Sequence, residues 1–162
     1  MAKFSSHQRF PVPVAELFAA HIDPRFQEAK ALALGATTAA AARRDEADGT
    51  VVVTIDTTDP PRWGSDPQAG TMIYRLDPGA LRGTWTRVQK GFEKKARAEG
   101  TIVFREASGG RSEVLVDGLI EIKVPIMGKM IEKKIVAAIA EQQPIEESIA
   151  AELLRKRAAQ GD

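Results

Sequence analysis

The sequence predicts an α+β domain in which a curved antiparallel sheet of about seven strands surrounds a long C-terminal helix. Three observations lead to this prediction. Short apolar-polar alternations separated by turn residues fill the middle of the chain, two short helical patterns precede them, and one long helical pattern follows them. With 162 residues, 43% of them hydrophobic, the chain is long enough to bury a core. We expect residues 1–162 to form a single domain, with residues 155–162 frayed.

The first part of the chain is predicted to form a strand and two short helices. Residues 3–10 are the expected strand, and the prolines that follow end it. The segment 14–22 has apolar residues at helical spacing. Asp23-Pro24 breaks that helix and caps a second one, which stops at Gly35.

The middle of the chain is predicted to form strands joined in hairpin succession. These strands are expected at residues 36–47, 51–58, 71–76, 83–90, 96–106 and 112–124. The alanine-rich first of them is assigned to a strand although alanine favours helix locally. Gly118 lies among apolar positions of the last strand and is expected to mark a bend or bulge. The Pro- and Gly-rich segment 59–70, which contains Trp63, is expected to be a loop.

A long amphipathic helix is predicted from Ile126 to about Ala158, because its apolar residues recur at steps of three and four. Pro144 removes one backbone hydrogen bond and clashes with the preceding turn, so we expect a kink or break near residues 142–144. Consecutive hairpins make an antiparallel sheet that hides one face. This helix alone is long enough to cover that face, and the sheet is therefore expected to curl around it.

The composition excludes several classes of function. Lys and Arg number 23 and Asp and Glu 22, so the net charge of +1 predicts no nucleic-acid partner. The absence of cysteine excludes disulfides, zinc-thiolate sites and cysteine nucleophiles. His7 and His21 are too few for a three-histidine metal site. We therefore predict no metal, no cofactor and no catalytic residue, and the pair Gly109-Gly110 lacks the helix of a dinucleotide site.

The N-terminal segment lacks the pattern of a signal peptide, and the apolar runs are far shorter than the about 20 residues that span a bilayer. A cytoplasmic location is therefore expected. The Trp63 loop and the apolar turn Pro125-Ile126-Met127 each allow several roles: a cavity lid, a partner anchor or a transient membrane contact. The sequence predicts no particular oligomeric state.

Several motifs identify a family resemblance. They are Gly118, Val124-Pro125, Gly128 and Ile131-Glu132-Lys133 at the end of the chain, with residues 10–18 and Asp23-Pro24 near its start. In these features the chain resembles a bacterial family of uncharacterised function within the START-like (SRPBCC) superfamily, which includes birch-pollen-allergen-type proteins, polyketide cyclases and lipid-transfer START domains. The resemblance implies a helix-grip fold that encloses an apolar cavity between the sheet and the long helix.

Nine residues are predicted to line that cavity as ligand-binding residues. They are Met72, Tyr74, Trp85, Phe104, Val116 and Ile120 from the strands and Ile131, Ile135 and Ile139 from the helix. Pockets of this kind are mostly apolar with a few placed polar groups. A plain packed core fits the same pattern, because strand parity does not distinguish a filled interior from a hollow one.

The predicted function is binding or transport of a hydrophobic small molecule, either a lipid or a polyketide-like compound. Two alternatives remain open. One is a cyclase- or hydratase-type enzyme that uses the same cavity, with Tyr74, His21 or Arg75 as acid–base groups; the shortage of such groups disfavours it. The other is a protein-interaction module with a filled core.

Overall fold

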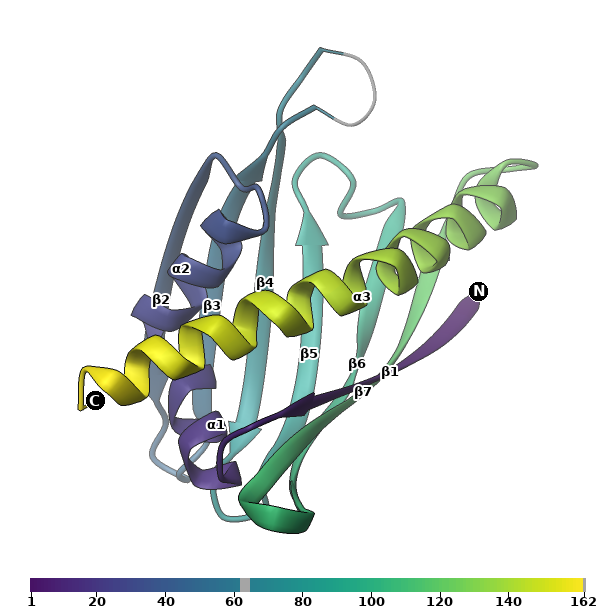
Figure 1. Ribbon diagram of the computed structural model, residues 1–162. Coiled ribbons are helices and arrows are strands. Elements are labelled where there is room, and N and C mark those ends of the chain that lie inside the picture. The colour runs from purple at the N-terminus through teal and green to yellow at the C-terminus, as the bar shows by residue number, and fades with distance from the viewer. Residues whose placement is uncertain (62–64, 162) are drawn as a thin grey trace.

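A seven-stranded antiparallel sheet curves around a long helix in the computed structural model, which describes residues 1–61 and 65–161 (Figure 1). The elements in chain order are β1 (Ala2–Phe10), α1 (Val14–His21), α2 (Pro24–Ala33), β2 (Thr38–Asp45), β3 (Val51–Asp59), β4 (Gln68–Asp77), β5 (Arg82–Gln89), β6 (Ala96–Ala107), β7 (Arg111–Ile122) and α3 (Gly128–Ala159). Trp63 lies outside the described residues, and the roles suggested for its loop stay predictions.

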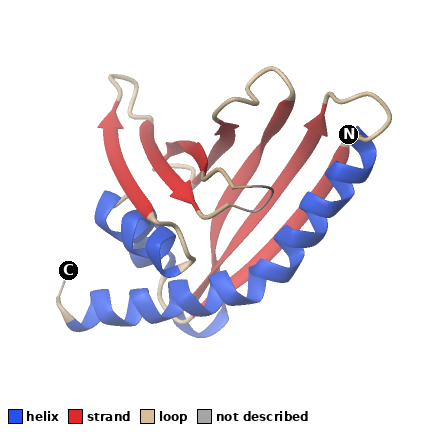
Figure 2. Ribbon diagram, turned by 90° about the horizontal axis from the view of Figure 1, so that it is seen from above, coloured by secondary structure: helices blue, strands red, loops and turns tan. Residues whose placement is uncertain are grey.

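The strand order across the sheet is β1-β7-β6-β5-β4-β3-β2, and every neighbouring pair is antiparallel. The first strand of the chain therefore pairs with the last, and the strands between them follow as hairpins. Figure 2 shows α3 running along the open side of the curved sheet. The predicted fold class is confirmed, including the alanine-rich strand β2.

The pairing register decides which side chains share the concave face. Val53, Tyr74, Trp85, Gly100 and Gly118 lie opposite one another in a single row that crosses five strands. Because directly paired residues of antiparallel strands point to the same side, these five share one face. The alternation of β-strands then places every second residue of each strand on that face as well.

The main core lies where α1 and the end of α3 cover one end of the concave face. Phe18 of α1 packs edge-to-face on Phe104 of β6, with ring centroids 5.2 Å apart. Leu76 of β4 and Leu154 of α3 are buried in the same cluster. The sheet and the C-terminal half of α3 are therefore held together at this end.

Two expectations for the strands are wrong. The segment 59–70 is not a loop throughout, because β3 and β4 stay paired as far as Asp59 and Gln68. Gly118 does not form a bulge, since it pairs with both neighbouring strands in continuous register. Its missing side chain instead leaves room for two rings: a Cβ there would lie 2.3 Å from Trp85 and 2.8 Å from Phe4.

Helix α3 continues through Pro144, so a break at this position is wrong. Figure 2 shows that the helix bends along its course instead, as expected where a proline removes one backbone hydrogen bond. The main-chain carbonyl of Gln143, the residue before Pro144, accepts a hydrogen bond from the Gln8 side chain at 3.2 Å. Helix α3 runs to Ala159, and Arg157 lies 3.6 Å from Asp23. The fraying expected over 155–162 stays a prediction.

Candidate functional site

The six strand residues predicted to line a cavity all lie on the concave face of the sheet. The register pairs Tyr74 with Trp85 directly, and it places Met72, Phe104, Val116 and Ile120 on the same side. Trp85, Phe104 and Ile120 are buried, whereas Met72, Tyr74 and Val116 are only partly buried. Solvent therefore reaches part of the apolar surface in the middle of this face.

The three predicted helix residues also keep solvent contact. Ile135 and Ile139 follow the buried Glu132 by three and seven residues, so they lie on the same side of α3. Ile131 lies beside them. All three isoleucines are partly exposed. The main sheet contacts of α3 are with β1 and β7, at one edge of the sheet. The helix therefore leaves its isoleucines less buried than the core cluster at the other end.

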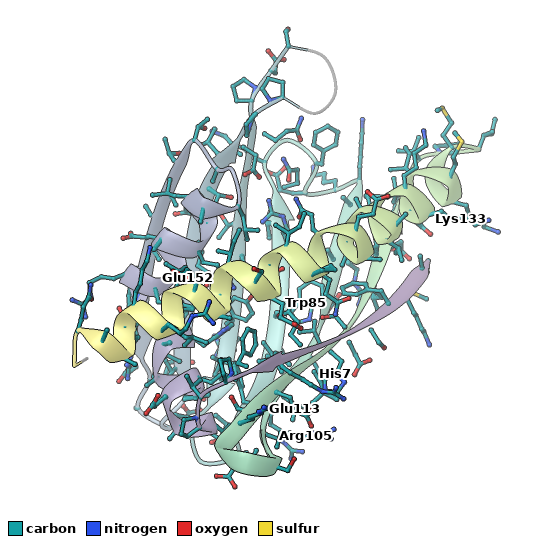
Figure 3. All side chains as sticks on the ribbon, viewed as in Figure 1. His7, Trp85, Arg105, Glu113, Lys133 and Glu152 are labelled. Carbon is teal, nitrogen blue, oxygen red and sulfur yellow. The ribbon has the colours of Figure 1, made fainter. Side chains whose placement is uncertain are left out.

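Trp85 forms the floor of this region. Its indole N–H donates a hydrogen bond to the Asp117 carbonyl at 3.2 Å, and its ring centroid lies 5.8 Å from that of Phe4. The side chain therefore extends from β5 across β6 to β7, over Gly118. Figure 3 labels Trp85 among the side chains of the sheet. This geometry gives the concave face a broad, rigid aromatic surface.

A buried histidine adjoins the apolar surface. The His21 ring contacts Tyr74 and Phe104 edge-on, with centroids 4.6 Å and 4.9 Å apart. Burial, together with the positive charge of Lys30, holds the pKa of His21 well below its usual value. Its Nε2 atom is buried and has no hydrogen-bond partner among the described residues. His21 is therefore a neutral imidazole at pH 7, with an unused polar atom inside the protein.

A cation and a carboxylate lie beside this histidine. Lys30 Nζ of α2 is 3.4 Å from Glu146 Oε1 of α3. Burial opposes the charge on Lys30, but Glu146 and Tyr74 outweigh it and raise the pKa of the ammonium. Burial also raises the pKa of the Tyr74 hydroxyl, against the lowering effect of Lys30. The charged pair and two neutral polar groups therefore converge at the packed end of the concave face.

Sequence reasoning missed Lys30 and Glu146. Lys30 carried the available signal, because it falls on the same helical stripe as Phe26, where an apolar residue is expected. Arg75, considered as an acid–base group, is excluded from this site. It lies on the outer face of β4, exposed to solvent, and it pairs with Glu46.

The far end of the concave face is polar. Arg87 of β5 and Asp59 of β3 form an ion pair with a nitrogen–oxygen distance of 3.6 Å. Gln89 donates a hydrogen bond to Gln68 at 3.0 Å. The apolar middle of the face is thus bounded by polar groups at both ends.

Two surface hollows of about 420 Å³ each lie elsewhere. One is at the start of α3 and is lined by Ile122, Ile126 and Glu132 among others. The second lies over β2, β3 and β4, next to Asp56 and Lys90. None of the nine predicted residues lines either hollow, so neither is the predicted cavity.

An ionic cluster occupies the outer face of the sheet. His7 Nε2 lies 2.5 Å from Glu113 Oε2, and Arg105 also pairs with Glu113. Figure 3 shows these three side chains close together on the side of the sheet away from α3. Hydrogen bonds from Arg105 and His7 hold the pKa of Glu113 below its usual value. The cluster ties β1, β6 and β7 together and does not face the concave site.

Over the part of the chain that the structure describes, there is no group of three or more His, Cys, Asp or Glu side chains able to hold a metal ion. Within the same residues, no helix combines the length and the hydrophobicity needed to cross a bilayer.

The chain matches the model of a protein family. The model of the protein family of unknown function DUF2505 matches residues 70–154, just over half of the chain. The matched part runs from β4 to the C-terminal half of α3. The search of curated proteins gave no match.

Solved structures with the same architecture were found over nearly the whole chain. The protein TTHA0849 from Thermus thermophilus superposes with a TM-score of 0.69 at 16% identity, covering 96% of this chain and 99% of that one. The Zhui aromatase/cyclase from Streptomyces sp. R1128 gives 0.63 at 10% identity, with 97% and 95% covered. Norcoclaurine synthase from Thalictrum flavum gives 0.58 at 15% identity, with 98% and 86% covered. These likenesses show that the fold is the START-like helix-grip fold.

Proposed function

Since the chain belongs to the DUF2505 family, whose description assigns no function, we propose from its own site that it binds a hydrophobic small molecule between the concave face and α3. The observation that carries this proposal is the exposure of inward-facing apolar side chains. Met72, Val116 and Ile135 keep contact with solvent although they lie on the faces that the fold turns inward. A ligand there would remove apolar surface from water at a gain of about 25 cal/mol per Å².

The polar groups at the packed end support a ligand with one polar group. His21 and Tyr74 are neutral at pH 7, so they offer hydrogen bonds without the desolvation cost of burying a lone charge. The His21 Nε2 atom, which has no partner among the described residues, is the group that gains most from a hydrogen bond supplied by a ligand. An apolar body with one hydroxyl or carbonyl group, as in a lipid or a polyketide-like compound, fits this arrangement.

The structural neighbours support a small-molecule role for this fold without naming a ligand for this chain. One neighbour is an aromatase/cyclase and another is a norcoclaurine synthase. A fold shared with enzymes does not establish catalysis. The cytoplasmic location expected from the sequence stays a prediction.

A second candidate function is catalysis of the cyclase or hydratase type in the same place. It is favoured by the convergence of Lys30, Glu146 and Tyr74 on the concave face. The raised pKa keeps Lys30 protonated, so its ammonium group could stabilise negative charge on a bound carbonyl oxygen. The filled-core interaction module is less well supported, because solvent reaches the inward-facing apolar side chains.

The binding proposal is tested with an environment-sensitive apolar dye, 1-anilinonaphthalene-8-sulfonate, and a matched pair of variants. Ile135→Trp enlarges a side chain that lines the proposed site, and Ile145→Trp makes the same change at an exposed position of the same helix. We expect the first variant to bind the dye at least about tenfold more weakly and the second to bind it like the unchanged protein. Equal dye binding by all three proteins would contradict the proposed site.

The natural ligand is sought by native mass spectrometry of the protein isolated from its own cells, followed by solvent extraction. A stoichiometric apolar adduct supports binding. If added protein then converts the extracted compound, and Lys30→Met abolishes the conversion, the protein is an enzyme. If the compound is bound and recovered unchanged, the protein is a carrier.

A further inference from the structure

The connection between β7 and α3 carries a group of exposed apolar side chains, which we call the apolar tip: Ile126, Met127 and Met130. Ile126 is 101% exposed, Met127 50% and Met130 48%. They lie within five residues of one another, at the start of the long helix. Isolated exposed apolar residues are ordinary on protein surfaces, but a group of large ones marks an interaction site.

The backbone of the apolar tip is strained at Ile126. Ile126 has φ +70°, in the left-handed region that a β-branched residue rarely adopts. Its conformation therefore costs free energy while presenting the whole side chain to solvent. The main chain on either side is held in place, because Gly128 N–H donates to Val124 O at 2.9 Å and Met127 N–H donates to Pro125 O at 2.8 Å. The fold thus keeps Ile126 projecting outward.

Lysines surround the apolar tip. Lys123, Lys129 and Lys133 flank it along the chain, and all three are exposed. Figure 3 shows Lys133 at the end of α3 where the helix begins. The acidic groups of this region are already matched: Glu121 lies 3.8 Å from Lys123, and Glu132 accepts from the Ile122 amide at 2.9 Å and lies 2.7 Å from the N-terminal amine.

The neighbouring hairpin adds the same two kinds of residue. Phe92, 49% exposed, stands in the β5–β6 turn together with the exposed Lys90, Lys94 and Lys95. The one acidic residue among them, Glu93, accepts a hydrogen bond from the Gly91 amide at 3.0 Å. This turn is joined to the apolar tip by a hydrogen bond from Lys123 N–H to Lys95 O at 2.7 Å. Figure 1 shows both connections at the same end of the sheet. Apolar side chains and a basic border therefore form one surface.

We propose that this surface docks the protein on an anionic phospholipid bilayer, with the apolar tip inserted among the headgroups and acyl chains and the lysines facing the lipid phosphates. Insertion would remove the exposed apolar surface from water, and each lysine near a negatively charged leaflet adds attraction. A second copy of the chain is the poorer occupant. A symmetric pairing through the same patch would bring two basic borders together, and like charges repel.

The proposal is tested by co-sedimentation of the intact protein with empty vesicles, so it does not depend on any ligand of the concave site. Vesicles of phosphatidylcholine alone are compared with vesicles containing about 30% phosphatidylglycerol. We expect binding to the anionic vesicles and at least about tenfold weaker binding to the neutral ones, with a further loss at high salt. Equal binding to both vesicle types, or no binding to either, would overturn the proposal.

Two variants separate the apolar and the basic contributions. Ile126→Ser with Met127→Ser, which leaves the net charge unchanged, and separately Lys129→Glu with Lys133→Glu should each weaken binding to anionic vesicles at least about tenfold. Leu32→Ser with Ile145→Ser is the matched control for the first variant, because it removes two apolar side chains that are 49% and 57% exposed outside the tip, and it should bind like the unchanged protein. If the control loses binding as much as the tip variant, the tip is not the contact. If sedimentation velocity shows a dimer that the tip variant dissolves, the occupant is a second copy and the membrane proposal is wrong.

Discussion

Gly118 and His21 are two residues whose roles depend on their neighbours across the sheet. At Gly118 the absence of a side chain admits the rings of Trp85 and Phe4, which approach to 2.3 Å and 2.8 Å of the place that a Cβ would occupy. At His21 burial among Tyr74 and Phe104 removes the imidazole from water. Both residues therefore serve the concave face, the first by making room for an aromatic floor and the second by supplying a buried polar atom.

The burial of His21 predicts an acid-sensitive stability. Its pKa is well below the usual value of 6.5 in the folded protein, so the unfolded chain binds a proton below about pH 6.5 that the folded chain does not. The contribution of the neutral, buried His21 to the free energy of unfolding is fully present above that pH. It is lost as the pH falls toward the pKa of the folded state, with a slope of up to about 1.4 kcal/mol per pH unit. Urea unfolding at pH 7, 6 and 5 measures this.

His21→Leu should remove that part of the pH dependence. Gln27 donates to the main-chain carbonyl of residue 21 at 2.7 Å, so this hydrogen bond survives the substitution. The carboxylates whose pKa values are lowered, such as Glu113 and Glu132, contribute mainly at more acidic pH. An identical slope in both proteins between pH 7 and pH 5 would show that His21 is not the titrating group.

Helix α3 has two halves with different partners. In the first half Glu132 accepts from the Ile122 amide, and in the second half Ala150 and Leu154 are buried in the core. Pro144 lies between the halves, near the contacts that Gln143 and Glu147 make with β1. The bend seen in Figure 2 lets one helix follow the curved sheet from end to end.

Pro144→Ala should raise the free energy of unfolding by about 1–2 kcal/mol. Alanine restores the N–H that the helix lacks and removes the ring clash, which stabilises the folded protein. The greater conformational entropy of the unfolded variant offsets part of this increase in the free energy of unfolding. Urea unfolding at pH 7 measures the change, with Glu141→Ala, at an exposed position of the same helix, expected within about 0.5 kcal/mol of the unchanged protein. A less stable Pro144→Ala would mean that the halves need the bend in order to pack.

The molecule as a whole is closed at one end and open at the other. The helices α1 and α2 and the end of α3 cover one end of the concave face with a buried core. Toward the start of α3 the inward isoleucines keep solvent contact, and the apolar tip projects from the same end. Ligand entry and membrane contact, if both proposals hold, would thus share the open end.

Hydrogen exchange followed by mass spectrometry should show this asymmetry. The amides of residues 132–142 are expected to exchange faster than those of 150–158, because buried apolar side chains anchor only the later segment. A bound apolar ligand should slow exchange in the first segment and leave the second unchanged. Equal protection of both segments without ligand would contradict the description of an open end.

The order of strands and helices was determined by the sequence alone, because hydrophobic periodicity and turn residues are local properties. The alternation within β4 and within β7 predicted that Tyr74 and Val116 point inward, and the pairing register places both on one face of the sheet. The order of the elements, together with motifs near both ends of the chain, identified the helix-grip architecture that the superposed structures show. The apolar turn ahead of α3 was also recognisable, since three adjacent residues carry it.

Only the tertiary structure decided which polar groups meet on the concave face. Lys30 and Glu146 are 116 residues apart, and their contact exists because α2 and α3 are brought together at one end of the sheet. The burial of His21, the outward position of Arg75 and the exposure of Ile126 likewise follow from packing between distant elements. Periodicity specifies the direction of a side chain relative to its own strand or helix. The groups that it meets depend on contacts between elements that no local pattern contains.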